Sequence, residues 1–211
     1  ESNDIIKLNP YNLNNKLITE KEILSILKAY NIEENITNLE IYQRSFIHKS
    51  YIKKENKKDV ELEEKPDNCL DLQDVSNERL EYLGDAILSA TVASYLFERF
   101  PNEEEGFMTR IRTKLVNGEM LGNLAGKMKL NKHLIISRHV EEKCNGRNSV
   151  KILEDIFESL IGAIYLDFNE NELEHPRLEF YSGLGFQMCQ VFIINIIEKF
   201  VDFSDLILND Y

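Results

Sequence analysis

Three acidic residues recur at helical spacing within an apolar stretch, and this pattern constrains the chain more than any other feature. Glu78, Glu81 and Asp85 are separated by three and four positions, so on a helix their carboxylates stack on one face. Leu80 and Ile87 fall on the opposite face, as a buried side requires. Each neighbouring pair of like charges costs about 0.2–0.5 kcal/mol. The spacing is compatible with a plain solvated face, but on a half-buried helix it favours a bound cation.

A second acidic pair occurs in a strongly apolar segment further along the chain. Asp155 and Glu158 are three positions apart on one helical face, and Gly162 continues that face without a bulky side chain. If this helix packs beside the first, its two acids can meet Glu81 and Asp85. Four carboxylates are the oxygen ligands that Mg²⁺ or Mn²⁺ prefers. Two such ions can activate water and stabilise an in-line phosphoryl transition state.

Charge and cysteine content limit the possible partners and compartment. The net charge of −12 argues against a polyanionic partner, unless bound cations neutralise the acids and the basic residues are clustered. The three cysteines, at positions 69, 144 and 189, are an odd number without metal-ligand spacing. They predict reduced thiols in an intracellular protein of the cytoplasm or nucleus, without a zinc site. No apolar run is long enough to suggest a membrane partner.

Helical periodicity dominates the chain, and convincing strand alternation is missing, so the sequence predicts an all-α fold. We expect one domain over residues 19–202, preceded by a polar arm at 1–18 and followed by the start of a linker at 203–211. Thr19 and Glu22 form a capping-box pattern at the first helix. The expected helices cover residues 21–30, 39–51, 77–97, 103–117, 119–128, 150–166 and 186–201, and the longer loops cover 52–75, 137–148 and 167–185.

Four segments resemble motifs of the ribonuclease III family. Residues 77–88 (NERLEYLGDAIL) are similar to its long, ungapped signature. Residues 45–51, 105–117 and 155–167 resemble the helix end before the signature, the helix after it and the second acidic motif, in the same order. The second motif is close to the version in Dicer-type enzymes. The resemblance extends over roughly residues 20 to 200.

This resemblance implies an all-helical endonuclease domain that forms a homodimer and accepts double-stranded RNA in a valley containing two active sites. By matching position, the metal ligands would be Glu81, Asp85, Asp155 and Glu158, with two Mg²⁺ per site, for which Mn²⁺ can substitute. Glu78 and Glu105 match acids close to the site or to the dimer interface. The family hydrolyses each strand to leave 5′-phosphate and 3′-hydroxyl ends with a two-nucleotide 3′ overhang.

The chain departs from the family pattern in its loops and at its end. Residues 52–75 are far longer than the connection usual in bacterial members, and their polar composition predicts an exposed loop. A double-stranded-RNA-binding domain is not recognisable in this sequence. Residues 203–211 fall where a linker to such a domain would begin.

Basic and amide side chains near the acidic motifs are candidate RNA contacts. Two of them share a face of the helix after Glu105, and others lie at a helix N-terminus, where backbone amides suit phosphate. A lysine one turn before Asp155 either stabilises the scissile phosphate or merely pairs with that acid. These candidates are Arg110, Lys114, Asn117, Arg147, Asn148 and Lys151.

Three functional interpretations follow from the sequence. The first is a Mg²⁺-dependent endoribonuclease that acts on double-stranded RNA, with the four acids as catalytic metal ligands. The second is a catalytically silent double-stranded-RNA-binding scaffold of the same fold. The third is a helical interaction domain without a nucleic-acid role. Filled acidic positions in both motifs favour the first interpretation.

Overall fold

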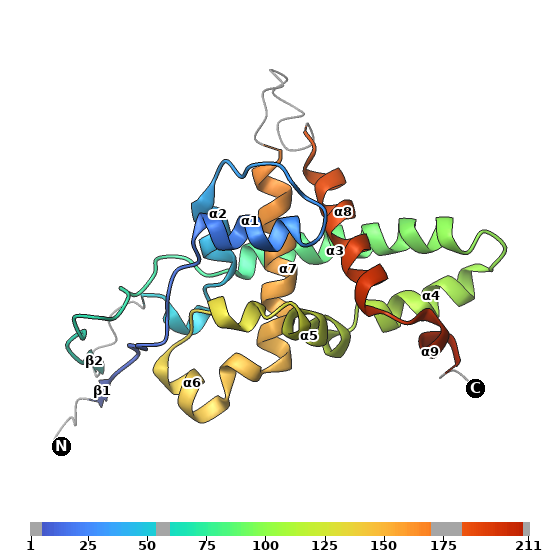
Figure 1. Ribbon diagram of the computed structural model, residues 1–211. Helices are drawn as coiled ribbons and strands as arrows, with labels where there is room; N and C mark the ends of the chain where they lie inside the picture. The colour runs from blue at the N-terminus through green and yellow to red at the C-terminus, as the bar shows by residue number, and fades with distance from the viewer. Residues whose placement is uncertain (1–5, 54–59, 170–182, 209–211) are drawn as a thin grey trace.

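The computed structural model describes residues 6–53, 60–169 and 183–208. Over these ranges the chain is mostly helical, with one short parallel sheet, so the all-α prediction is confirmed (Figure 1). None of the helices in the described ranges combines the length and the apolar character needed to cross a bilayer. The helices are α1 Glu20–Lys28, α2 Leu39–Ser45, α3 Glu78–Arg99, α4 Glu105–Leu115, α5 Gly118–Lys127, α6 Arg138–Cys144, α7 Val150–Asp167, α8 Gly185–Phe200 and α9 Phe203–Leu208.

Helix α7 forms the centre of the core. Ile156, Leu160 and Ile164 are fully buried along it, and most of its other residues are buried too, because the segment is apolar around most of its circumference. Helices α2, α3, α5 and α8 pack around it, and Figure 1 shows α3 crossing behind α7 near its middle. The predicted apolar helix therefore serves as the axis on which the other elements are assembled.

The crossing of α3 and α7 depends on two glycines. A Cβ atom placed on Gly84 would lie 1.7 Å from the backbone oxygen of Glu158. A Cβ atom on Gly162 would lie 2.3 Å from the backbone oxygen of Leu80. Both positions require glycine because the Cβ atom of any other residue would clash with the backbone of the neighbouring helix. The helices thus approach each other most closely where the two acidic motifs lie.

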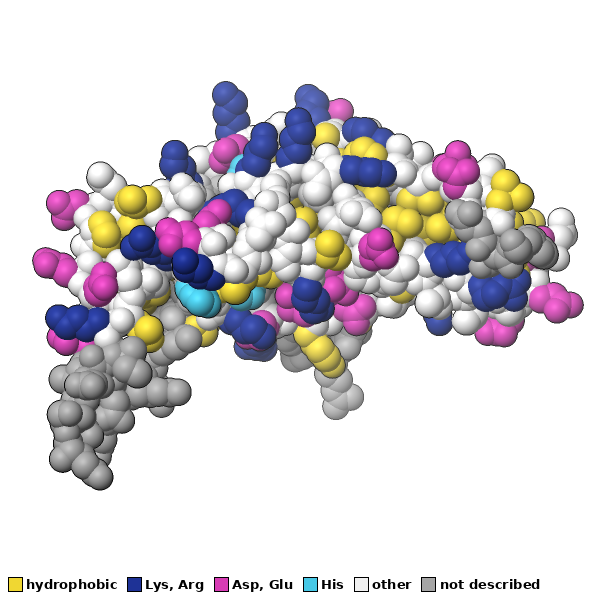
Figure 2. Space-filling model, turned by 90° about the horizontal axis from the view of Figure 1, so that it is seen from below, with side chains coloured by type: hydrophobic (Ala, Val, Ile, Leu, Met, Phe, Trp, Pro, Cys, Tyr) yellow, Lys and Arg dark blue, Asp and Glu magenta, His cyan; other side chains and the backbone are white. Residues whose placement is uncertain are grey.

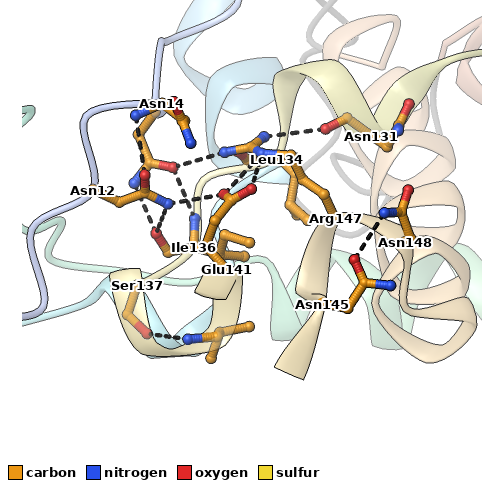
Figure 3. Close-up of polar contacts among 12 residues, drawn as sticks. Asn12, Asn14, Asn131, Leu134, Ile136, Ser137, Glu141, Asn145, Arg147 and Asn148 are labelled. Carbon is orange, nitrogen blue, oxygen red and sulfur yellow. Dashed lines mark hydrogen bonds and ion pairs between the residues drawn. The ribbon is translucent and has the colours of Figure 1, made fainter. Parts of the chain in front are cut away.

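The N-terminal segment packs against the body of the protein, in contrast to the polar arm predicted from sequence. The Asn12 and Asn15 amides both donate to the backbone oxygen of Ile136, at 3.1 and 2.9 Å. Asn12 also donates to Glu141, which forms an ion pair with Arg147 at 2.8 Å (Figure 3). These side-chain amides satisfy a buried backbone oxygen that has no partner in a helix or sheet.

The helix predicted over residues 39–51 ends earlier, at Ser45. Beyond it Ile47 forms an isolated parallel bridge with Ile135, and its backbone oxygen accepts a hydrogen bond from the Asn77 amide at 2.8 Å. These long-range backbone partners are incompatible with helical hydrogen bonding at Ile47. A short 3₁₀ turn, Lys49–Tyr51, then follows.

Most described residues of the segment 52–75 are exposed, as predicted, but the segment contains a strand and backbone pairing that the sequence did not indicate. Strand β2 (Val60–Leu62) pairs in parallel with β1 (Ile6–Leu8). Lys53 and Gln73 are joined by a backbone hydrogen bond of 2.8 Å, and Cys69 is buried. Residues 54–59 lie outside the described ranges. The two ends of the segment therefore pair with each other, and its strand β2 pairs with the N-terminal strand β1.

Two further connections contain unexpected structure. The predicted loop over residues 137–148 contains α6, capped by the Ser137 side chain, and a 3₁₀ turn at Gly146–Asn148. Asn145 connects them in the left-handed conformation, with φ of 49°. Helix α9 occupies most of the segment predicted as a linker. In the predicted loop over 167–185, residues 170–182 lie outside the described ranges.

Candidate active site

The α3–α7 crossing brings the two predicted acidic motifs to one place. Glu81 and Asp85 flank Gly84 on α3, and the Gly84 backbone lies against the backbone of Glu158 on α7. Asp155 precedes Glu158 by one helical turn. Glu158 is buried, with 6% of its surface exposed, whereas Asp85 faces solvent. The cluster therefore lies at the protein surface and extends inward along α7.

The electrostatics of these carboxylates show that they act on one another. Burial and, after it, the negative charges of Asp85, Glu154 and Glu81 together raise the pKa of Glu158 to about 8. Burial also raises the pKa of Glu81, with a second contribution from Asp155. The neighbouring carboxylates thus disfavour the ionised forms of Glu81 and Glu158.

This donor set fits a hard divalent cation. Carboxylate oxygens are the ligands of Mg²⁺ and Mn²⁺, and a cation would offset the repulsion that raises these pKa values. Among the residues that the structure describes, however, no three His, Cys, Asp or Glu side chains are already positioned to hold a metal ion. The acids therefore share a surface without forming a complete coordination shell.

Two lysines border the acidic cluster. Lys151 forms ion pairs with Glu154 at 3.1 Å and with Asp155 at 2.9 Å, so the pairing alternative considered for this lysine is present in the structure. The two carboxylates raise the pKa of Lys151. Lys49 forms an ion pair with Glu78 at 3.1 Å, at the start of α3. Positive charge therefore lies at the rim of the cluster.

His48 has a structural hydrogen bond beside the site. Its Nδ1 atom lies 2.8 Å from the Ser50 hydroxyl and accepts a hydrogen bond from the Ser50 amide at 3.2 Å. Burial lowers the pKa of His48. With Nδ1 engaged in the turn that follows α2, the ring is oriented by its own segment.

Arg147 and Asn148 form hydrogen bonds with other parts of the protein. The Arg147 guanidinium donates to the backbone oxygen of Leu134 at 2.7 Å and pairs with Glu141, and its side chain is mostly buried (Figure 3). The Asn148 amide donates to the Asn145 side chain at 2.8 Å. Arg147 therefore anchors the loop before α7 and does not face solvent as a phosphate contact would.

The other predicted RNA contacts lie on α4 and at its junction with α5. Arg110 is exposed on α4. The Lys114 ammonium group donates to the backbone oxygen of Leu206 at 2.9 Å. Asn117 caps α5, where its side-chain oxygen accepts from the Met120 amide at 2.8 Å. The capping role of Asn117 leaves its NH₂ group bonded to the Lys114 backbone at 3.0 Å.

Of the two other acids expected near the site or the interface, Glu78 lies one turn before Glu81 and Glu105 lies on a different helix, α4. Glu78 occupies the first turn of α3 and is half exposed. Glu105 opens α4 and accepts a hydrogen bond from the Thr109 hydroxyl at 2.7 Å. Glu105 also borders a hollow between α3 and α4, whose other lining residues are Ala93, Leu96, Phe97, Met108, Thr109 and Arg112.

Sequence reasoning assigned no role to Glu154, although the structure places it beside the cluster. It pairs with Lys151 and lies four residues before Glu158, so both carboxylates occur on one face of α7. The sequence did contain a signal for Glu154, because it lies three residues after Lys151 and four residues before Glu158, and both were predicted site residues.

Comparison with known proteins agrees with this arrangement. Residues 78–169 match the model of the ribonuclease III domain. The matched residues include both acidic motifs and the α3–α7 crossing. The family resemblance seen in the sequence is thereby confirmed.

Individual relatives extend this match. The chain is 31% identical over 213 residues to a probable ribonuclease 3 of Acanthamoeba polyphaga mimivirus, covering all of this chain and 38% of that protein. It is 38% identical over 130 residues to ribonuclease 3 of Listeria innocua, covering 62% of this chain and 50% of the relative. The chain thus spans half or less of the length of these curated relatives.

Solved structures support the fold. Two solved structures of the nuclease domain of ribonuclease III from Campylobacter jejuni superpose with a TM-score of 0.60 at 26% identity. The first covers 86% of this chain and 98% of the Campylobacter chain, and the second covers 83% and 96%. The second structure is described as showing flexibility in a region involved in dimer formation.

Proposed function

We propose that this protein is an endoribonuclease that hydrolyses phosphodiester bonds in double-stranded RNA. The observation that carries this proposal is the convergence of Glu81, Asp85, Asp155 and Glu158 at the α3–α7 crossing, within the segment that matches the ribonuclease III domain. The domain would span residues 19–202, with residues 203–211 leading away from it. The expected products carry 5′-phosphate and 3′-hydroxyl ends with two-nucleotide 3′ overhangs.

The four acids are the proposed ligands of Mg²⁺, or of Mn²⁺ as a substitute, with two ions per site. Such ions supply Lewis-acid stabilisation of the phosphate and a water molecule of lowered pKa. Buried Glu158 contributes a carboxylate that water solvates poorly, which strengthens its interaction with any cation that it meets. Exposed Asp85 leaves the cluster open to a large substrate.

The protein's own residues would bind and orient the RNA. Lys151, with its side chain 67% exposed at the rim of the cluster, is placed to contact a phosphate beside the reacting bond. Arg110 and Lys114 on α4 are proposed contacts to the RNA backbone. Figure 2 shows Lys and Arg side chains along one edge of the lower face, so basic groups gather locally despite the net charge of −12.

We also propose that the domain works as a homodimer. Helix α3 has an exposed apolar stripe that begins at Tyr82, with 83% of its surface exposed, and ends at Phe97, with 69% exposed. Ala86 and Ala90 lie between them at helical spacing and are exposed too. Large exposed aromatic residues in one row are typical of an interface. The hollow between α3 and α4 borders the same stripe.

A reducing compartment is the proposed location. The three cysteines are free thiols, of which Cys69 and Cys189 are buried. Burial raises the pKa of the Cys189 thiol, which keeps it protonated and unreactive. This arrangement suits a protein that does not depend on disulfide bonds for stability.

The alternative function is a catalytically silent double-stranded-RNA-binding scaffold of the same fold. The two functions are separated by incubating long duplex RNA with the protein and Mg²⁺, beside a Glu158→Gln variant. The enzyme proposal expects cleavage by the wild type alone. Tight binding of the duplex without cleavage by either protein would select the scaffold.

A further inference from the structure

Lys151 is shared between two carboxylates that have different roles in the proposed site. Its ammonium group lies 2.9 Å from Asp155, a proposed metal ligand, and 3.1 Å from Glu154, which has no such role. The lysine side chain is 67% exposed, whereas the two acids are only 15% and 17% exposed. If Asp155 binds a cation, Glu154 is the ion-pair partner that remains for Lys151.

The position of Glu154 is set by the start of α5. A Cβ atom on Gly118, the first residue of that helix, would lie 2.7–2.9 Å from the Glu154 carboxylate. The carboxylate therefore fits only because position 118 has no side chain. A negative group is also favourable near a helix N-terminus. Helices α5 and α7 pack side by side, so this contact is held by the fold.

Glu154 also acts on the buried end of the cluster. It lies one helical turn before Glu158, on the same face of α7. After burial and Asp85, its negative charge is the next largest cause of the raised pKa of Glu158. Glu154 is thus in electrostatic contact with the proposed site although it is directed toward Lys151 and Gly118.

We propose that Glu154 is a positioning residue that retains the Lys151 ammonium group beside the reacting phosphodiester when Asp155 is engaged with a cation. Without Glu154, a flexible lysine at a solvated rim would lose its remaining anchor and sample many rotamers. This role rests on the proposed nuclease function. It also implies that position 118 must be glycine to leave room for the Glu154 carboxylate.

The test is a double-mutant cycle in duplex-RNA cleavage at saturating RNA and Mg²⁺. We expect Glu154→Ala and Lys151→Ala each to lower kcat by roughly tenfold, and the double variant to be no slower than Lys151→Ala alone. Gly118→Ala should reproduce the loss, since its Cβ displaces the carboxylate. Gly126→Ala is the matched control on the same helix, because nothing lies within 4 Å of a Cβ there.

A second readout does not depend on cleavage. In protein with isotope-labelled lysine side chains, Mn²⁺ alone should strongly broaden the NMR signal of the Lys151 side chain, and Glu154→Ala should greatly reduce that broadening. Equal broadening in both proteins, or multiplicative losses of kcat in the double variant, would overturn the positioning role. If the wild type cleaves no duplex RNA, the nuclease proposal fails instead, and the NMR comparison, which needs no cleavage, still tests the contact between Glu154 and Lys151.

Discussion

Gly84 offers a direct test of how the site is assembled. In Gly84→Ala, the new methyl group would lie 1.7 Å from the backbone oxygen of Glu158, whereas ordinary contacts begin at 3.4 Å. Because both partners belong to helix backbones, α3 and α7 would have to separate by roughly 1.7 Å in this densely packed core. We expect a loss of about 1–3 kcal/mol in the free energy of unfolding. Misplacement of catalytic groups by about 1 Å costs on the order of 100-fold in rate.

The assay combines urea denaturation with duplex-RNA cleavage under conditions where the variant remains folded. Gly126→Ala is the control, because it adds the same methyl group to α5 without a clash and should stabilise that helix by about 1 kcal/mol. A folded Gly84→Ala protein that cleaves at the wild-type rate would refute the argument that this crossing positions the carboxylates.

Further predictions concern pH, the buried ion pair and the interface. Because the pKa of Glu158 is raised from 4.5 to about 8, the folded protein retains a proton that the unfolded chain has lost across this interval. Without metal, the free energy of unfolding should therefore fall as pH rises from about 5 to 8. Urea titrations of Glu158→Gln should show a weaker dependence of this free energy on pH. The same dependence in both proteins would contradict the raised pKa of Glu158. Arg147→Ala leaves Glu141 unpaired among mostly buried groups and should cost about 3 kcal/mol in urea denaturation, so a change below about 1 kcal/mol would argue against the anchoring role. Phe97→Asp places a charge on the exposed stripe of α3 and should convert a dimer to a folded monomer in light scattering; an unchanged dimer mass would place the interface elsewhere.

Elements with a strong apolar period were predictable from the sequence. Helices α3, α7 and α8 have closely the expected bounds, because their buried faces recur at helical spacing. The Thr19–Glu22 capping box is present as predicted, since both of its partners lie within one turn. Local chemistry determined these features.

The elements that were missed depend on distant partners or weak local signals. The helix predicted over 39–51 ends at Ser45 because Ile47 pairs with Ile135, far along the chain. Strands β1 and β2 pair across more than fifty residues and are too short for a sequence pattern. Helix α6 is short and polar and contains no fully buried residue, so periodicity gave no signal for it.

The same distinction applies to the site. Glu81, Asp85, Asp155 and Glu158 could be paired from two local motifs, whose packing the two glycines permit. The engagement of Arg147 could not be predicted, because its partners come from the N-terminal segment and from the chain before α6. Likewise, the Gly118 contact that holds Glu154 appears only when α5 packs on α7.

The most direct test of the central claim is the fate of a long, blunt-ended duplex RNA incubated with the protein and Mg²⁺. The four-carboxylate site predicts internal cleavage to fragments with 5′-phosphates and two-nucleotide 3′ overhangs. It also predicts that Glu158→Gln abolishes cleavage while the variant still folds and binds the duplex. Undiminished cleavage by Glu158→Gln, or no cleavage by a wild-type protein that binds both duplex RNA and Mg²⁺, would contradict the claim.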